Sequence, residues 1–278
     1  MAQTINTNLM SINAQRNLTG SKSAMELAVQ RLSSGLRVNS SKDDAAGLAI
    51  AERMHALVRG MNVAIRNAND AISLAQVADG ALGQVSEITQ RMRELAVQAA
   101  NATNDSSDRG TLDTEFQQLA LELTRTVNGA KFNGKQIIGA DAGTLNFQVG
   151  ATTASEDKVQ VATANLSTAT ELASVIAGNI RTVTGADSAM DSIDDLLDLV
   201  NSQRAIYGAI QNRFTSIIST LQVSVENQSA ARSRIMDADF AAETAALTRA
   251  QVLQQAGQAM LAQANSSTSN ILSLLQRL

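Results

Sequence analysis

Hydrophobic residues recur at helical spacing at both ends of this chain. Ile5, Leu9 and Ile12 follow one another at steps of four and three residues. Side chains at such steps share one face of a helix, so the pattern predicts amphipathic helices over about 5–33 and 240–276. The first helix also carries apolar residues at Met25, Val29, Leu32 and Leu36, and the last at Leu247, Leu253, Met260, Leu261, Leu272 and Leu275.

Long helices are also predicted between the two ends. Residues from 45 to about 100 keep the helical spacing without a break, and a shorter helix follows around Phe116–Val127. A seven-residue repeat, typical of a left-handed coiled coil, then runs without a slip. Its positions are Leu196, Val200, Gln203, Tyr207, Ile210, Phe214, Ile217, Leu221 and Ser224.

Local signals predict where these helices begin and end. Ser41 with Asp44, and Ser188 with Asp191, have the three-residue spacing of a capping box and predict helix starts. Residues 33–35 and 39–41 predict a break after the first helix, and the polar stretch 101–110 predicts a loop.

Hydrophobic periodicity changes from helical to alternating in the middle of the chain. Leu145 and Phe147 alternate with polar residues, and so do Val159 and Val161. This alternation predicts a β-hairpin with a loop of about eight residues. Asn133-Gly134 is a turn signal, and residues 163–187 predict a loop with a short helix near 171–177.

Together these patterns predict a mainly α fold, an elongated coiled-coil helical bundle with a small β-hairpin. The two terminal helices carry apolar residues on more than one side. Two helices alone cannot bury that much surface, and each exposed Leu or Ile forgoes about 1.5–3 kcal/mol of burial. We therefore expect both ends to pack against copies of the same chain.

Composition supports this interpretation and narrows the class of protein. Aromatic residues make up only 2% of the chain, and proline and cysteine are absent, which suits long helices packed through Ala, Leu and Ile. The net charge is −4 without a basic run, so no nucleic-acid partner is expected. We also expect no membrane insertion and no Sec-type signal peptide, because no long apolar stretch occurs.

The sequence contains few residues that could form a catalytic or metal-binding site. His55 is the single histidine, and a catalytic or metal-binding histidine needs partners that the sequence does not supply. The acidic clusters at 43–44, 191–198 and 237–239 are expected to stabilise helix N-termini. No glycine-rich phosphate loop occurs. We therefore expect no enzyme activity, no cofactor and no metal. The alternative hypothesis from a different functional class is an enzyme or metal-binding protein on a helical scaffold.

Several motifs, taken in order, resemble bacterial flagellin. They are LSSGLRVNS at 32–40, KDDAAGLAI at 42–50, ANDAIS at 68–73, RELAVQ at 93–98, SRIMDADFA at 233–241 and AMLAQAN at 259–265. The resemblance covers roughly residues 1–150 and 188–278, so only a short variable segment remains between the two halves. It implies a short form of the family, without the outer variable domains.

The resemblance implies a structural subunit that polymerises into the extracellular flagellar filament after secretion through the flagellar type III export apparatus. Residues 1–43 and 236–278 would pair as an inner coiled coil, while 44–187 with the hairpin and 188–235 would form an outer bundle. The assembly residues are then Ile5, Leu9, Ile12, Leu32, Leu36, Leu253, Met260, Leu261, Leu272 and Leu275. A hook–filament junction protein of the same family is the alternative.

The resemblance also implies partners other than the chain itself. In flagellins that Toll-like receptor 5 detects, the residues matching Arg91, Leu95, Gln98 and Glu115 lie at or near the receptor contact. Recognition would need the monomer, because neighbouring subunits cover this face in a filament. Export chaperones, innate immune sensors and hook-associated proteins are the other expected partners.

Overall fold

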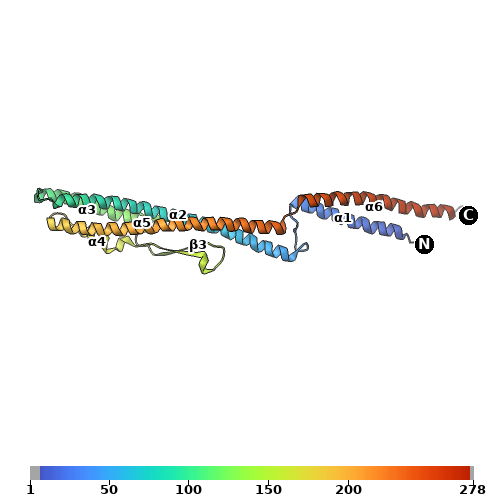
Figure 1. Ribbon diagram of the computed structural model, residues 1–278, viewed down its shortest axis with the longest axis horizontal. Helices are drawn as coiled ribbons and strands as arrows, with labels where there is room; N and C mark the ends of the chain where they lie inside the picture. Colours follow the sequence, from blue (N-terminus) through green and yellow to red (C-terminus); the bar gives the residue numbers. More distant parts are fainter. Residues whose placement is uncertain (1–6, 276–278) are drawn as a thin grey trace. The chain divides into compact units, whose positions relative to one another are not determined.

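The computed structural model describes residues 7–275, with side chains described for 7–267. Its helices are α1 (Leu9–Ser34), α2 (Ala45–Ala100), α3 (Ser106–Gly129), α4 (Thr170–Ala177), α5 (Val183–Met236) and α6 (Phe240–Leu275) (Figure 1). Four short strands, β1 (Lys131–Phe132), β2 (Lys135–Gln136), β3 (Thr144–Gln148) and β4 (Lys158–Ala162), lie between α3 and α4. The predicted mainly α fold with a small β-hairpin is confirmed.

The chain divides into two compact units, Met1–Ala56 with Asn227–Leu278 and Leu57–Glu226. The first unit contains α1 and α6, which pack along each other, and the second contains α3, α4 and all four strands. Helices α2 and α5 contribute to both units. The predicted boundaries after residues 43 and 235 both fall inside the first unit.

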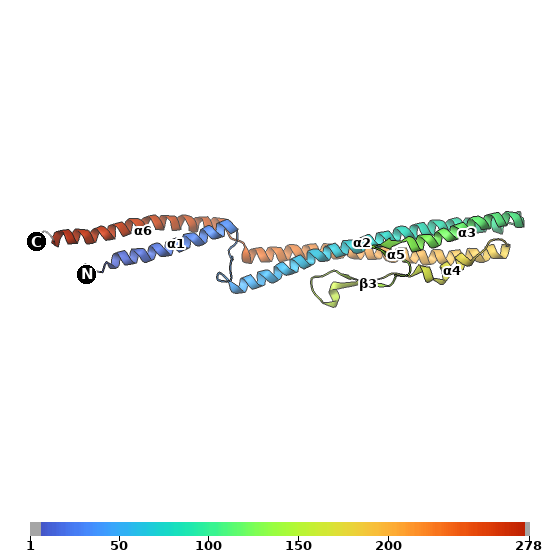
Figure 2. The same cartoon turned by 180° about the vertical axis from the view of Figure 1, so that it is seen from behind.

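Large side chains fill the core of the second unit, where α2, α3 and α5 lie side by side (Figure 2). Leu82, Phe116 and Ile193 are fully buried there. Every position of the predicted seven-residue repeat in α5 is buried or half-buried: Leu196, Val200, Gln203, Tyr207, Ile210, Phe214, Ile217, Leu221 and Ser224. The repeat therefore identified the inward face of α5 correctly.

The predicted β-hairpin is present and packs on the same unit. Strands β3 and β4 pair antiparallel, with Leu145 opposite Val161 and Phe147 opposite Val159. Phe147 meets Phe214 of α5 edge to face, with ring centroids 5.6 Å apart. A Cβ on Gly60 of α2 would lie 2.8 Å from the Ala151 Cβ, so only glycine allows the hairpin loop to approach this closely.

A second, smaller hairpin was not predicted from the sequence. The Asn133-Gly134 turn signal is confirmed, since both residues have positive φ, of 50° and 82°. The flanking strands β1 and β2 have only two residues each, which is too short for an alternating pattern to be recognised.

The predicted start of the helix at Ala45 is confirmed, although its capping residue differs, and two other predicted boundaries were wrong. Asp44 caps α2 by accepting the Gly47 N–H, so the box with Ser41 does not form. Helix α5 begins at Val183, where the Thr182 hydroxyl accepts the Gly185 N–H, and the proposed Ser188–Asp191 box lies inside the helix. The loop expected over 101–110 ends early, because Asp105 and Asp108 form a capping box for α3.

Tyr207 is the single tyrosine of the chain and lies in the core of the second unit, 1% exposed. Its hydroxyl has no hydrogen-bond partner among the described residues. Burial raises the pKa of the Tyr207 hydroxyl to about 12, because the phenolate would lose its water. An unsatisfied buried polar group costs about 1–3 kcal/mol, so this hydroxyl opposes folding.

Tyr207→Phe is therefore expected to raise the free energy of unfolding by about 1 kcal/mol, measured by urea denaturation near neutral pH. The unfolded tyrosine ionises at about pH 10. The folded group keeps its proton to about pH 12, so wild-type stability is full below pH 10 and falls as the pH rises above it. In the phenylalanine variant, the free energy of unfolding should not show the part of this decrease that comes from ionisation of the tyrosine. A clear loss of stability at neutral pH would mean that the hydroxyl has a partner.

Candidate functional site

Helices α1 and α6 form an antiparallel pair. At one end the Asn8 side chain donates to the Ala264 carbonyl, with N and O 2.9 Å apart. At the other end Arg31 Nη1 donates to Glu243 Oε1 at 3.0 Å. The numbering rises along one helix as it falls along the other, which defines the antiparallel direction.

The inward face of this pair consists mainly of small and polar residues. Buried and half-buried positions recur at alternating steps of three and four in both helices, as in a coiled-coil seam. In α1 they are Ser11, Ala14, Leu18, Ser21, Met25, Ala28 and Leu32, and in α6 they are Glu243, Leu247, Ala250, Gln254, Gly257, Leu261 and Ala264.

Gly257 shows how closely the two helices approach. A Cβ at this position would lie 3.1 Å from Leu18 Cδ1. A larger residue would therefore push the helices apart or force Leu18 to move. The seam is narrow because its residues are small, and it buries correspondingly little apolar surface.

Large apolar side chains of the same two helices point outward instead. In α1, Leu9 is 67% exposed and Ile12 46% exposed; in α6, Leu253 is 54% exposed and Met260 58% exposed. These four are predicted assembly residues. Met10, Leu27, Val29, Phe240 and Val252 are exposed as well. The expectation that the terminal helices leave apolar surface uncovered is thus met in this unit.

Helix α6 carries a second stripe with the same periodicity as its inward seam. Its members, all exposed, are spaced by alternating steps of four and three: Ala242, Ala246, Arg249, Leu253, Ala256, Met260 and Gln263. Such a repeat is what a helix uses to pack against another helix. No described residue of this chain covers it.

The remaining predicted assembly residues have different positions. Leu32 and Leu261 are half-buried in the seam between the two helices. Leu36 packs on a small core formed by Val38, Ala51 and Met236. Ile5 lies outside the described residues, and Leu272 and Leu275 lie in α6 beyond the described side chains.

The backbone after α1 is tied to the backbone before α6. The Arg37 N–H donates to the Met236 carbonyl at 2.6 Å, and the Ala238 N–H donates to the Gly35 carbonyl at 2.9 Å. Gly35 makes this turn possible because its φ is 70°, a conformation that other residues rarely adopt. The motifs at 32–40 and 233–241 thus meet in space, which sequence separation alone does not reveal.

The predicted receptor face is built around Arg91 in the second unit. Its guanidinium donates to Glu94 Oε2 at 2.8 Å and to Glu115 Oε1 at 2.8 Å. Hydrogen bonds to Glu94 and then Glu115 raise the pKa of Arg91. Arg91, Glu115 and Gln98 are exposed. Arg91 and Glu115, from two helices, therefore present one joined polar patch.

Leu95 does not belong to that exposed patch. The structure buries it in the core of the second unit, where it is 1% exposed. A receptor docking on this face cannot reach its side chain without rearrangement of the core. The prediction that Leu95 is a direct contact is therefore corrected: it supports the helix that presents Arg91.

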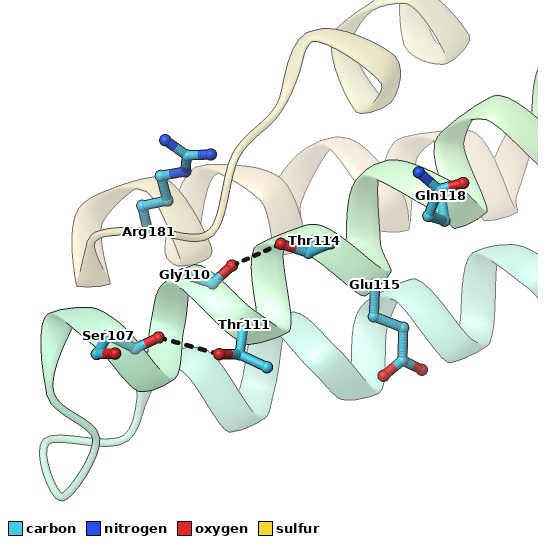
Figure 3. Close-up of a pocket in the computed structure, with 7 residues that line it drawn as sticks. All are labelled: Ser107, Gly110, Thr111, Thr114, Glu115, Gln118 and Arg181. Carbon is cyan, nitrogen blue, oxygen red and sulfur yellow. Dashed lines mark hydrogen bonds between the residues drawn. The ribbon is translucent and has the colours of Figure 1, made fainter.

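Two open grooves flank this polar patch. One, of about 770 Å³, runs along α3 and is lined by Ser107, Gly110, Thr111, Thr114, Glu115, Gln118 and Arg181. Figure 3 shows Glu115 reaching from α3 toward α2, while Arg181 comes from the segment before α5. The other, of about 430 Å³, is lined by Gln90, Arg93, Glu94, Val97 and Gln98. Both grooves are open to solvent.

Nothing in the described residues resembles a catalytic or metal centre. They contain no group of three or more His, Cys, Asp or Glu side chains placed to hold a metal ion. His55 is half-exposed on α2. In the same part of the chain, no helix combines the length and the apolar character needed to cross a membrane.

Comparison with known proteins agrees with the motifs. The family model for the bacterial flagellin N-terminal helical region matches residues 5–141, and the model for the C-terminal helical region matches residues 190–275. A flagellin from Halalkalibacterium halodurans is 45% identical over 273 residues, which is 98% of this chain and 99% of that protein. Flagellin FlaB2 from Treponema pallidum is 38% identical over 287 residues, 98% and 99% of the two chains.

Among solved structures, the crystal structure of Bacillus cereus flagellin is 29% identical with a TM-score of 0.49, covering 56% of this chain and 88% of that one. The length of this chain agrees with its relatives, because both curated flagellins are matched over nearly their whole length. The chain therefore belongs to the bacterial flagellin family and is a structural subunit of a flagellar filament, not an enzyme.

Proposed function

We propose that this subunit polymerises through the outward apolar side chains of α1 and α6. One observation carries the proposal: Leu9, Leu253 and Met260 are exposed on the outside of the pair, although small residues take up much of its inward seam. A helix pair that needed only itself would bury Leu9, Leu253 and Met260 and expose its alanines and serines. Neighbouring copies supply the cover that the monomer lacks.

The energetic argument favours assembly over an isolated pair. Fully burying a Leu, Ile or Met side chain contributes about 1.5–3 kcal/mol, and Leu9, Ile12, Leu253 and Met260 are each about half exposed or more. The stripe through Leu253 and Met260 has the repeat that fits another helix. If the contact joins two different surfaces of the subunit and does not close, the product is an open helical filament.

In this proposal residues 1–43 and 236–278 line the inside of the filament, and 44–187 with 188–235 form its outer wall. The subunit is exported through the flagellar type III apparatus and is held before assembly by a chaperone, and hook-associated proteins adjoin the finished filament. The relatives named above are flagellins, so we propose a filament subunit and not a hook–filament junction protein.

We also propose that the monomer is recognised by Toll-like receptor 5 through Arg91, Glu115 and Gln98. The exposure of all three side chains and the joined Arg91–Glu115 pair support this proposal. Because Arg91 already pairs with two carboxylates, the receptor must bind the patch as a unit or displace those partners.

Removal of residues 1–33 or 240–278 should abolish filament formation and leave a folded helical core. The buried residues of the second unit lie outside both deletions, so its helices keep their packing. Electron microscopy of salt-seeded samples tests assembly, and circular dichroism of the soluble protein tests folding. Filaments from either truncated chain would refute the proposed assembly surface.

A point variant tests the outward stripe more finely. Leu253→Gln with Met260→Gln should raise the critical concentration for assembly at least tenfold, because these side chains are buried only in the polymer. Ala245→Gln, exposed on α6 outside the stripe, is the matched control. Sedimentation of polymer from a dilution series gives the critical concentration, and equal values for stripe and control would argue against the stripe.

Arg91→Ala should weaken receptor signalling by the monomer, with Arg204→Ala as a control. Arg204 pairs with Asp79, so its loss removes a comparable surface ion pair outside the two grooves that flank the patch. A reporter cell assay with purified monomer measures the response. Equal signalling by wild type and Arg91→Ala would show that the patch is not the contact.

A further inference from the structure

A cavity of about 250 Å³ opens between the β1–β2 hairpin, β3 and α2 in the second unit. Its walls are mostly apolar, formed by Leu74, Phe132, Ile137, Leu145 and Phe147. Leu74 and Ile137 are buried, while the two phenylalanines and Leu145 are only half-buried because they face this space.

Size and lining suit an apolar side chain. An apolar cavity of about 150 Å³ in another protein stays dry and takes up benzene, so a larger one has room for the end of a leucine. The half-buried walls would gain further burial from such an occupant.

Charged and polar residues lie at the rim of the cavity. Lys135 makes no ion pair with any described residue, and Asp141 uses one carboxylate oxygen to accept the Gln136 N–H at 3.0 Å. The rim therefore presents one positive and one negative group beside an apolar opening.

A matching projection occurs on α3 of the same unit. Leu121 is 64% exposed, the highest value among the exposed large hydrophobic residues of this unit. Glu122 and Arg125 flank it and pair with each other, with Arg125 Nε 2.7 Å from Glu122 Oε2. The exposed leucine has one negative and one positive group beside it, and the apolar cavity has one positive and one negative group at its rim. The two surfaces are therefore complementary in apolar character and in charge.

We propose that Leu121 of one subunit inserts into this cavity of a second copy of the chain. Glu122 then faces Lys135, and Arg125 faces Asp141, so the charges orient the contact while the leucine supplies burial. Projection and cavity are different surfaces of one subunit. Each copy offers both, so the contact can repeat from copy to copy, and it extends an open filament when the rotation between copies does not close a ring.

This inference rests on the proposed polymerisation and adds a contact outside the terminal helices. It needs no rearrangement of the monomer, because Leu121 is already exposed and the cavity is already open. Val223, the next most exposed large apolar residue of this unit at 55%, has a shorter side chain. Its only acidic neighbour within four positions is Glu226, and no basic residue accompanies it.

Assembly of point variants gives the first test. Leu121→Ala should raise the critical concentration for polymerisation about tenfold, and Asn146→Trp, which fills the cavity from its rim, should do the same. Val223→Ala is the matched control and should assemble as wild type does. Circular dichroism of each monomer checks that the fold is kept.

Cross-linking gives the second test and identifies the contact directly. The chain has no cysteine, so Leu121→Cys and Asn146→Cys can be introduced singly into the full-length protein. Mixed and polymerised under mild oxidation, the two variants should form disulfide-linked dimers, whereas Val223→Cys with Asn146→Cys should not.

The outcomes separate this contact from the proposed function. If wild type polymerises while Leu121→Ala and Asn146→Trp assemble at the wild-type concentration and no specific dimer forms, the contact is refuted and the filament proposal stands. If wild type does not polymerise under any condition, the filament proposal itself fails. Dimers from Leu121→Cys alone would mean that the leucine meets a copy of itself, which also refutes the contact.

Discussion

The arrangement of the terminal helices depends on the close approach of α1 and α6 at a seam rich in small residues. Gly257 lies where a Cβ would come 3.1 Å from Leu18, and Ser11, Ser21, Ala28 and Ala250 complete much of the inward surface. Helices this close leave room for few large side chains between them. Leu18, Met25, Leu32, Leu247 and Leu261 are half-buried in the seam, whereas Leu9, Ile12, Leu253 and Met260 lie outside it and are exposed.

The second unit differs from the terminal helices because it places its large side chains inside. Its core contains Phe116, Leu82, Tyr207 and other large side chains with almost no exposure, and the hairpin closes one flank through Phe147 and Phe214. Such a core stabilises itself within one chain. The protein thus combines a part that folds on its own contacts with a part that leaves apolar surface exposed in the monomer, which suits a subunit that must exist both as a monomer and in a polymer.

Periodicity predicted the helices, the β3–β4 hairpin and the inward face of α5, because burial repeats along an element that packs on one side. Helix starts were harder to predict. Ser188 and Asp191 have capping-box spacing, yet Ala186, Ala189 and Ile193 are buried on one face, so the packing continues the helix back to Val183. Leu95 follows the apolar spacing of its helix and is buried accordingly; only the receptor role implied by the resemblance conflicts with this burial, since its neighbours Arg91 and Gln98 are exposed.

Periodicity has a physical limit that the terminal helices make clear. Helix α6 carries two stripes of the same repeat, one through Gly257 and Leu261 and the other through Leu253 and Met260. A repeat shows which residues share a face, but it does not show which face the partner helix covers. The two stripes are similarly apolar, since the first also carries Leu247 and the second carries Leu253, Met260 and several alanines. Hydrophobicity therefore does not select the face that packs within the chain. That choice depends on shape, because Gly257 in the first stripe allows the close approach to Leu18, and the second stripe stays exposed.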